Sequence, residues 1–192
     1  MVEMVTQDNL GGYVKGGDPA TWFPELWRWV VKEFGVKDVL DLGCGEGHAL
    51  RYFKDELGCN VVGVDGVEQK DADPTLRIYT HDFERWAWTS WPVDLIWTCE
   101  FVEHVEERFL PNLNGAFGMG KLVLMTHAFP KQAGHHHVNC REAEYWKGYM
   151  AGLGFRFDQE LTNATRSLAR INRDEHNHYA RSGMAFWSPS VS

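Results

Sequence analysis

The spacing of apolar residues changes along the chain and predicts its secondary structure. Between residues 22 and 34 apolar side chains recur every three or four positions, which predicts an amphipathic helix. They are Trp22, Phe23, Leu26, Trp27, Val30, Val31 and Phe34. Pro24 suits the first turn of this helix, and Gly35 suits its end.

Short continuous apolar runs follow, and they predict buried strands. The strands are expected over Val36–Leu42, Asn60–Val64, Leu76–Tyr79, Val93–Thr98, Lys121–Thr126 and Phe155–Asp158, with a short final one over Ala185–Trp187. A helix is expected over Glu46–Leu57, before Gly58. A second is expected over Arg141–Gly152, with Asn139 as its N-cap and Glu142 as the capping-box partner. Strands that alternate with helices predict an α/β fold with a mostly parallel sheet and helices on both faces.

Composition and charge narrow the class of protein. The chain has 192 residues, of which 44% are hydrophobic and 14% aromatic, so it is able to bury a full core as one domain over residues 1–192. The net charge is −8, and Lys and Arg form no dense run. An extended nucleic-acid surface is therefore not expected, although a nucleic acid held in a local groove stays compatible with this charge.

Cysteine usage and hydropathy indicate a cytoplasmic protein. Cys44, Cys59, Cys99 and Cys140 form no CxxC pair, which is typical of a reduced chain. The first thirty residues hold no basic stretch followed by an apolar run, so no signal peptide is expected. No apolar run is long enough to predict a membrane span.

A glycine-rich turn after the first predicted strand carries the main functional signal. Gly43, Gly45 and Gly47 follow the acid Asp41, and a predicted helix comes next. Glycine accepts a positive φ and lets a ligand approach the backbone closely. The spacing G-x-G-x-G differs from the G-x-G-x-x-G of dinucleotide folds, and the charge of Asp41 would repel a pyrophosphate. A strand–turn–helix without a ligand is the other interpretation.

The segment Val39–Gly47 resembles motif I of class I S-adenosylmethionine-dependent methyltransferases. Four later segments resemble further motifs of that family in the expected order, and they cover residues 61–65, 81–83, 94–105 and 120–127. Residues 99–107 and 126–139 also resemble small phage and bacterial methyltransferase-like proteins. The resemblance implies a Rossmann-like fold with a mostly parallel seven-stranded sheet, S-adenosyl-L-methionine as cofactor and S-adenosyl-L-homocysteine as product.

The resemblance also implies roles for single residues. The negative charge of Asp41 would attract the ammonium group of the methionine part, and Asp65 would accept hydrogen bonds from both ribose hydroxyls. Asp82 would contact the adenine amino group, and the backbone N–H of Phe83 would contact the ring. Tyr13 would place its ring near the sulfonium. The full set of expected cofactor-binding residues is Tyr13, Asp41, Gly43, Cys44, Gly45, Gly47, Asp65, Gly66, Asp82, Phe83, Cys99 and Glu100.

Two histidines follow predicted strand ends and are candidate catalytic bases. His104 follows the fourth strand and His127 the fifth, so both are expected on the ligand side of the sheet. Histidine titrates in the range that suits removal of a hydroxyl proton. A structural role is the alternative for each of them, and Glu100 and Glu103 are weaker candidates.

The run His135, His136 and His137 is the most unusual local feature of the chain. Three consecutive histidines do not all face one way, but a loop would allow two of them to meet His127 at one point. Neutral imidazoles at such a point suit zinc or a similar metal. A polar loop that contacts substrate without a metal is the preferred interpretation, and no metal is expected.

These patterns together predict an organisation and a function. Residues 1–35 form an N-terminal lid and helix, residues 36–130 the cofactor-binding core, and residues 131–192 the substrate side with the C-terminal strands. The polar stretch 160–182 suits either a helix on the sheet or an arm that contacts substrate. The expected reaction is methyl transfer to an oxygen or nitrogen of a small molecule, a sugar or a nucleotide. The residues after the fourth strand are T-C-E-F instead of N-P-P-Y, so methylation of DNA base amino groups is not expected.

Two other functions stay open. One is a catalytically silent module that binds S-adenosylmethionine and acts through protein contacts. The other is an NAD-dependent oxidoreductase, which the glycine spacing disfavours. The sequence carries no signal for the oligomeric state.

Overall fold

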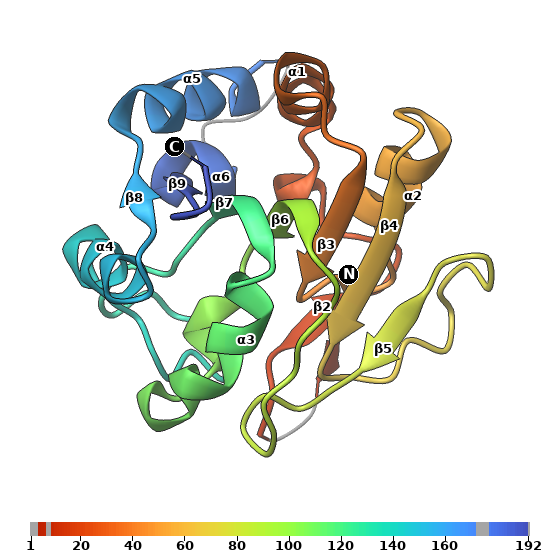
Figure 1. Ribbon diagram of the computed structural model, residues 1–192. Helices are drawn as coiled ribbons and strands as arrows, with labels where there is room; N and C mark the ends of the chain where they lie inside the picture. Colours follow the sequence, from red (N-terminus) through yellow and green to blue (C-terminus); the bar gives the residue numbers. More distant parts are fainter. Residues whose placement is uncertain (1–3, 7–8, 172–176, 192) are drawn as a thin grey trace.

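A mixed sheet of seven strands forms the centre of the computed structural model, which describes residues 4–6, 9–171 and 177–191 (Figure 1). The strand order is β5-β4-β3-β6-β7-β9-β8. The strands are β3 (Asp38–Leu42), β4 (Asn60–Asp65), β5 (Ile78–Thr80), β6 (Val93–Thr98), β7 (Gly120–Met125), β8 (Arg156–Phe157) and β9 (Met184–Trp187). Neighbouring strands pair in parallel from β5 through β4, β3 and β6 to β7. Strand β9 runs antiparallel to both β7 and β8. The predicted sheet is thereby confirmed.

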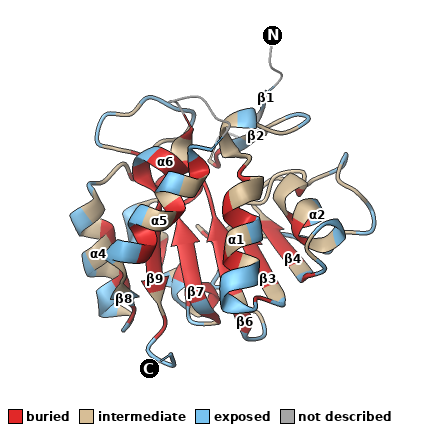
Figure 2. Ribbon diagram, turned by 90° about the horizontal axis from the view of Figure 1, so that it is seen from above, coloured by how far each residue is buried: buried red, intermediate tan, exposed pale blue. Residues whose placement is uncertain are grey.

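Helices cover both faces of this sheet, as expected. The helices are α1 (Pro24–Phe34), α2 (His48–Asp55), α3 (Asn114–Phe117), α4 (Ala143–Gly152), α5 (Gln159–Ala169) and α6 (His178–Ser182), with short 3₁₀ turns η1 (Pro19–Thr21), η2 (Val102–His104) and η3 (Glu107–Leu113). Figure 2 shows α1 and α5 lying across one face. Side chains of α3 and α4 pack on the other face, in a separate apolar cluster.

Alternate residues of the central strands point into these two apolar layers. Val39 and Leu95 pack with α1, whereas their neighbours Leu40 and Ile96 pack with α3 and α4. Side chains of a strand alternate between the faces of a sheet, and a sheet covered on both faces needs apolar residues at every position. That requirement explains why these strands read as continuous apolar runs.

The strand order of the sheet reverses direction beside β3. The chain runs outward from β3 through β4 to β5 and then returns to β6 on the other side of β3. Ligands of open α/β sheets bind beyond the carboxyl ends of the strands at such a point. Figure 2 shows β2 and α6 at the end toward which the parallel strands point. Strand β2 (Gly12–Val14) pairs antiparallel with β1 (Met4–Thr6), a hairpin that the sequence did not predict.

The first helix begins and ends as predicted, but the start of α4 differs. Pro24 occupies the first turn of α1, and Gly35 closes the helix in the left-handed conformation with φ 62°. The N-cap of α4 is Glu142, and the prediction of Asn139 is wrong. Asn139 is buried, and its backbone N–H donates to the backbone carbonyl of Glu103 at 3.0 Å, so a contact between distant segments decides its conformation.

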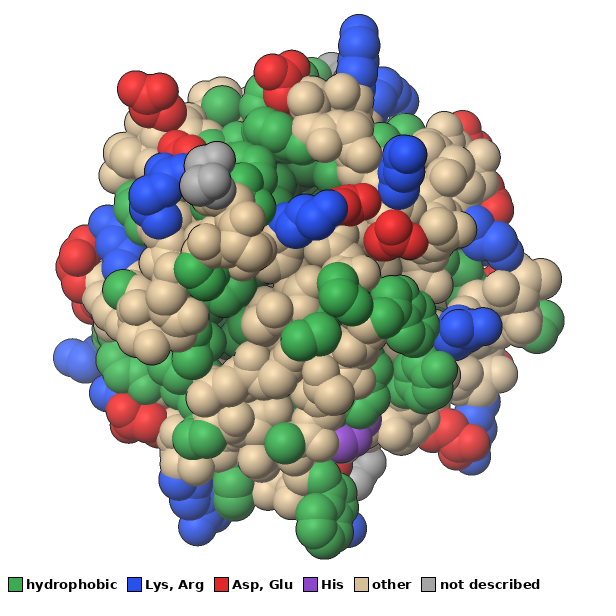
Figure 3. Space-filling model, viewed as in Figure 1, with side chains coloured by type: hydrophobic (Ala, Val, Ile, Leu, Met, Phe, Trp, Pro, Cys, Tyr) green, Lys and Arg blue, Asp and Glu red, His purple; other side chains and the backbone are tan. Residues whose placement is uncertain are grey.

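The polar stretch 160–182 and the distribution of surface charge are the remaining features of the fold. Helices α5 and α6 occupy most of residues 160–182, so the helical interpretation of that stretch holds for its described part. On the face shown in Figure 3, Lys and Arg side chains are scattered among acidic and apolar ones. Among the described residues, no helix has both the length and the apolar character that a membrane span needs.

Candidate functional site

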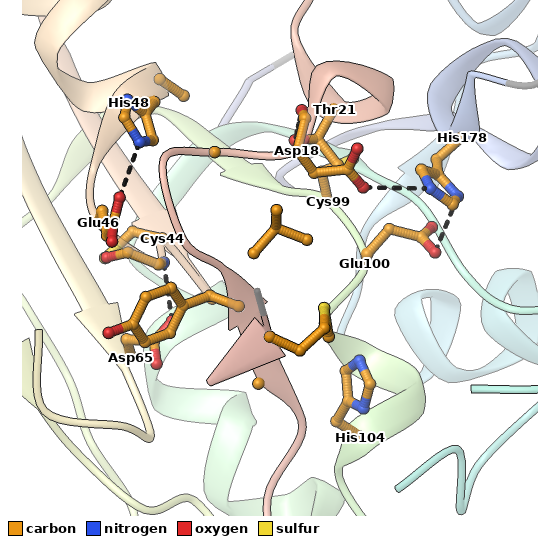
Figure 4. A pocket seen from close by; sticks show the side chains of 18 of the residues that line it. Asp18, Thr21, Cys44, Glu46, His48, Asp65, Cys99, Glu100, His104 and His178 are labelled. Atoms are coloured by element: carbon orange, nitrogen blue, oxygen red, sulfur yellow. Dashed lines mark hydrogen bonds and ion pairs between the residues drawn. The ribbon is translucent and has the colours of Figure 1, made fainter. Parts of the chain in front are cut away.

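A cavity of about 650 Å³ lies at the carboxyl ends of β3, β4 and β6 (Figure 4). Its wall includes the turn after β3, the end of β4, the residues after β6, the N-terminal segment and the loop before α4. Cavities of roughly 300–1,000 Å³ are the usual size for small-molecule and cofactor sites. The cavity therefore occupies the position and has the size expected of a ligand site in this topology.

The glycine-rich turn forms one wall of the cavity. Gly43, Gly45 and Gly47 all have positive φ, at 76°, 51° and 77°. A Cβ at Gly43 would lie 2.7 Å from the Cβ of Phe101, so glycine is required there both for its backbone angle and for the close approach. The backbone N–H of Gly43 donates to the carbonyl of Val64 at 2.8 Å, which ties the turn to the end of β4.

Two acids stand at the ends of neighbouring strands and line the cavity. Asp41 is 3% exposed, and burial raises its pKa well above the usual range, with the charge of Asp65 adding to the effect. Burial also raises the pKa of Asp65, although hydrogen bonds act in the opposite direction. Asp65 accepts from the backbone N–H of Gly45 at 2.8 Å and of Val67 at 2.9 Å. A cationic or hydroxyl-bearing ligand would stabilise these carboxylates.

The N-terminal segment closes the outer side of the cavity. The side chain of Tyr13 lies beside Gly45. A Cβ added to Gly45 would be 3.3 Å from the Cβ of Tyr13. The backbone N–H of Gly16 donates to Oε2 of Glu46 at 2.9 Å and joins this segment to the glycine-rich turn. A Cβ at Gly11 would meet the ring of His104 at 2.7 Å. The segment is thus held against both sides of the cavity.

His178 links three parts of the chain at the far wall (Figure 4). Its Nδ1 lies 2.9 Å from Oε2 of Glu100, and its Nε2 lies 3.7 Å from Oδ2 of Asp18. Burial lowers the pKa of His178, but hydrogen bonds and charge interactions with the two carboxylates outweigh it and raise the pKa to about 10. His178 is therefore charged at neutral pH. Glu100 has a φ of 54°, an uncommon conformation for a residue with a side chain.

A second group of titratable residues lies beside Glu100. Glu103 is fully buried, and neither carboxylate oxygen has a hydrogen-bond partner among the described residues. Burial, followed by the charge of Glu100, raises the pKa of Glu103 to about 8. Burial, followed by the charge of His137, lowers the pKa of His104 to about 4. The rings of His104 and His137 are 5.0 Å apart, and both residues line the cavity.

A family comparison identifies the type of protein that carries this cavity. Residues 19–160 match the model of a family described as a methyltransferase domain. The chain belongs to this methyltransferase family. No curated protein matches the methyltransferase at a significant level.

Solved structures with the same fold agree with that assignment. A SAM dependent methyltransferase from Archaeoglobus fulgidus is 19% identical, with a TM-score of 0.54 over 89% of this chain and 94% of that one. The methyltransferase domain of bacterial CtHen1-C is 17% identical, with a TM-score of 0.55 over 86% and 97%. The plantazolicin methyltransferase BpumL, solved with a triazolic desmethylPZN analog and SAH, is 12% identical, with a TM-score of 0.59 over 91% and 87%. The comparisons confirm the expected class I S-adenosylmethionine-dependent methyltransferase and its Rossmann-like fold.

The structure brings most of the predicted cofactor residues to one cavity. The residues of that set on the cavity wall are Tyr13, Asp41, Gly43, Cys44, Gly45, Asp65, Cys99 and Glu100. Gly47, Gly66, Asp82 and Phe83 are not on the wall. Phe83 is buried against Phe101, with ring centroids 5.7 Å apart, and Asp82 forms an ion pair with Arg85 at 3.1 Å. The adenine roles of Asp82 and Phe83 stay predictions.

The predicted histidines separate into different environments. His127 is 1% exposed and is not on the cavity wall, and its ring packs against Phe129 at 5.1 Å. The expected meeting of His127 with the run of three histidines does not occur, because the polar cluster of that loop forms with Glu103 and His104 instead. His135 and His137 line the cavity, whereas His136 faces Glu84 at 3.8 Å.

Asp18 and His178 are among the residues of the methyltransferase cavity that sequence reasoning missed. Asp18 and His178 lie far apart in the chain and line the same wall. His178 begins α6, where the side chain of Asn177 caps the helix by accepting from the N–H of Ala180 at 2.8 Å. An Asn before a short helix was the only local signal, and nothing in the spacing connected it with Glu100.

Proposed function

We propose that the cavity binds S-adenosylmethionine and that this methyltransferase transfers the methyl group to an oxygen or nitrogen of a small molecule, a sugar or a nucleotide. The observation that carries the proposal is the pair of acids at the cavity wall, Asp41 and Asp65, beside a turn of three glycines with positive φ. The cofactor carries an ammonium and a sulfonium and has no phosphate. Two buried acids favour such a cation and disfavour a pyrophosphate.

Asp65 is the residue that we assign to the ribose. Its carboxylate already accepts two backbone hydrogen bonds and one from the side chain of Gln69 at 3.1 Å. A carboxylate has about four lone-pair sites, and interactions with hydroxyls at the remaining positions would favour its charged form despite burial. Asp41 lies deeper in the cavity, and its negative charge would attract the ammonium group of the methionine part.

The transfer itself is an in-line displacement at the methyl carbon. A lone pair of the acceptor forms a bond to that carbon while the sulfur–methyl bond breaks, and neutral S-adenosylhomocysteine leaves. Most of the acceleration in such a reaction comes from holding the acceptor about 3–3.5 Å from the methyl group. Cys99 and Glu100 at the end of β6 would line the methyl end.

The assignment of Asp65 is tested by calorimetric titration with S-adenosylhomocysteine. Asp65→Ala is expected to weaken binding by about 10- to 100-fold, because hydrogen bonds to a charged group contribute about 1.5–3 kcal/mol. Asp55→Ala, an exposed acid at the end of α2, is the matched control and should bind as the unmodified chain does. Thermal unfolding shows whether the variants fold. Equal affinity of folded Asp65→Ala and the control would contradict the assignment.

A further inference from the structure

We propose that Glu103, His104 and His137 together bind a divalent transition-metal ion at the wall of the cavity. One ligand atom from each residue lies within 4.8 Å of the other two. Ligand atoms about 2.0–2.2 Å from one shared ion lie at most about 4.4 Å from one another. Small side-chain rotations would therefore bring the three groups onto a single ion.

The buried carboxylate of Glu103 supports this site independently of the spacing. The side chain is fully buried, and both of its oxygens lack a hydrogen-bond partner among the described residues. A buried acid without a partner is costly to keep charged, and buried carboxylates that stay charged are paired or bound to a metal. The backbone carbonyl of the same residue accepts from the N–H groups of Val138 and Asn139, both at 3.0 Å, which fixes it beside the loop that carries His137.

Both imidazoles are oriented as metal ligands usually are. Nδ1 of His104 lies 3.2 Å from the carbonyl of His136, and Nδ1 of His137 lies 3.1 Å from the carbonyl of Gln132. A carbonyl only accepts, so Nδ1 carries the proton in each ring and Nε2 keeps its lone pair. A backbone carbonyl on the second ring nitrogen is the common arrangement around metal-bound histidine. A Cβ at Gly134 would lie 2.2 Å from Nε2 of His137, so glycine there lets the ring pack closely against the backbone of its own loop.

The donor set and its location define the type of ion. Two imidazole nitrogens and one carboxylate oxygen suit Mn²⁺, Fe²⁺, Co²⁺ or Zn²⁺. Three protein ligands leave at least one coordination position for another molecule. His104 and His137 line the cavity, so that position would be reached from it. Glu100 is not counted as a ligand because its carboxylate pairs with His178.

The proposed ion also narrows the acceptor, and this step depends on the proposed methyl transfer. A hydroxyl oxygen bound to a divalent cation loses its proton to solvent more readily, which makes it a nucleophile near neutral pH. The oxygen then bonds to the methyl carbon as the sulfur–methyl bond breaks. An acceptor hydroxyl is therefore favoured over an amine, which needs no such activation.

The metal site is tested by titrating Co²⁺ into the full chain after treatment with EDTA, without an affinity tag that contains histidine. We expect one Co²⁺ per chain, with the visible absorption bands of protein-bound cobalt. Glu103→Gln and His137→Ala should each weaken binding by at least about 10-fold, since even residues that only orient a ligand cost about that much. His135→Ala is the matched control, because it belongs to the same histidine run but not to the cluster. Its affinity for Co²⁺ should equal that of the unmodified chain.

Several outcomes would overturn the proposal. One of them is a titration in which the chain does not bind Co²⁺ with a stoichiometry of about one ion per chain. Equal affinity of folded Glu103→Gln and the unmodified chain is another, and a loss in His135→Ala as large as that in His137→Ala is a third. S-adenosylhomocysteine affinity is measured on the same EDTA-treated samples. Binding of S-adenosylhomocysteine without binding of Co²⁺ would contradict only the proposed metal site. Binding of Co²⁺ without binding of S-adenosylhomocysteine would contradict the proposed cofactor.

Discussion

Single residues at the glycine-rich turn carry a clear physical signal in the sequence. Gly43 and Asp41 were predicted from their spacing, and the structure gives a reason for each: a positive φ against Phe101 for the glycine, and a place on the cavity wall for the acid. His178 carried no such signal. Its partners, Asp18 and Glu100, lie far from it in the chain, and only the folded molecule brings them together.

Substitution of Gly43 tests the conformational requirement of the turn. Gly43→Ala is expected to destabilise the fold by about 1–3 kcal/mol, because a Cβ is strained at a φ of 76° and lies 2.7 Å from the Cβ of Phe101. Unfolding by urea measures this change. Gly148→Ala is the control: it lies inside α4 with nothing within 4 Å of a Cβ, and it should stabilise the fold by about 0.5–1 kcal/mol. Equal effects of the two substitutions would show that the turn is not constrained.

At the scale of elements, local patterns predict the strands and most helices but not all of their ends. Continuous apolar runs indicate the central strands because helices cover both faces of the sheet. The predicted N-cap at Asn139 is wrong because its backbone bonds to Glu103, a contact that no local pattern contains. His127 follows the correctly predicted strand β7 but lies outside the cavity wall, and its backbone N–H donates to Oγ of Ser182 at 3.4 Å, another contact between distant segments.

The ion pairs of His178 join α6 to the N-terminal segment and to the end of β6, and they should make stability depend on pH. The pKa of His178 is about 10 in the folded chain, above the ordinary value of 6.5. Its contribution is therefore fully present below about pH 6.5 and is lost as the pH rises through 10. His178→Asn should lower the free energy of unfolding by about 1–3 kcal/mol at pH 6.

Urea unfolding at a series of pH values measures this effect. The difference in unfolding free energy between the unmodified chain and His178→Asn should be largest at pH 6 and shrink toward pH 10, because His178 loses its charge over that range. A difference that stays constant from pH 6 to pH 10 would show that the charge of His178 does not stabilise the contact with Asp18 and Glu100.

At the scale of the whole molecule, strand order decides which residues meet. The return of the chain from β5 to β6 gathers the ends of β3, β4 and β6 around one cavity, and the family match covers residues 19–160 of the chain. The motifs predicted that gathering because they imply a known topology. The N-terminal segment with Tyr13 was expected at the site, but the wall added by α6 was not predictable, since it depends on packing between segments that are distant in sequence.

We propose above that this cavity holds S-adenosylmethionine with its ribose on Asp65. A crystal structure with S-adenosylhomocysteine tests it most directly. We expect the ribose hydroxyls about 2.6–3.2 Å from the carboxylate of Asp65, the amino-acid portion beside Asp41, and the sulfur facing Cys99 and Glu100. A ligand that binds elsewhere, or in this cavity with its ribose away from Asp65, would contradict it.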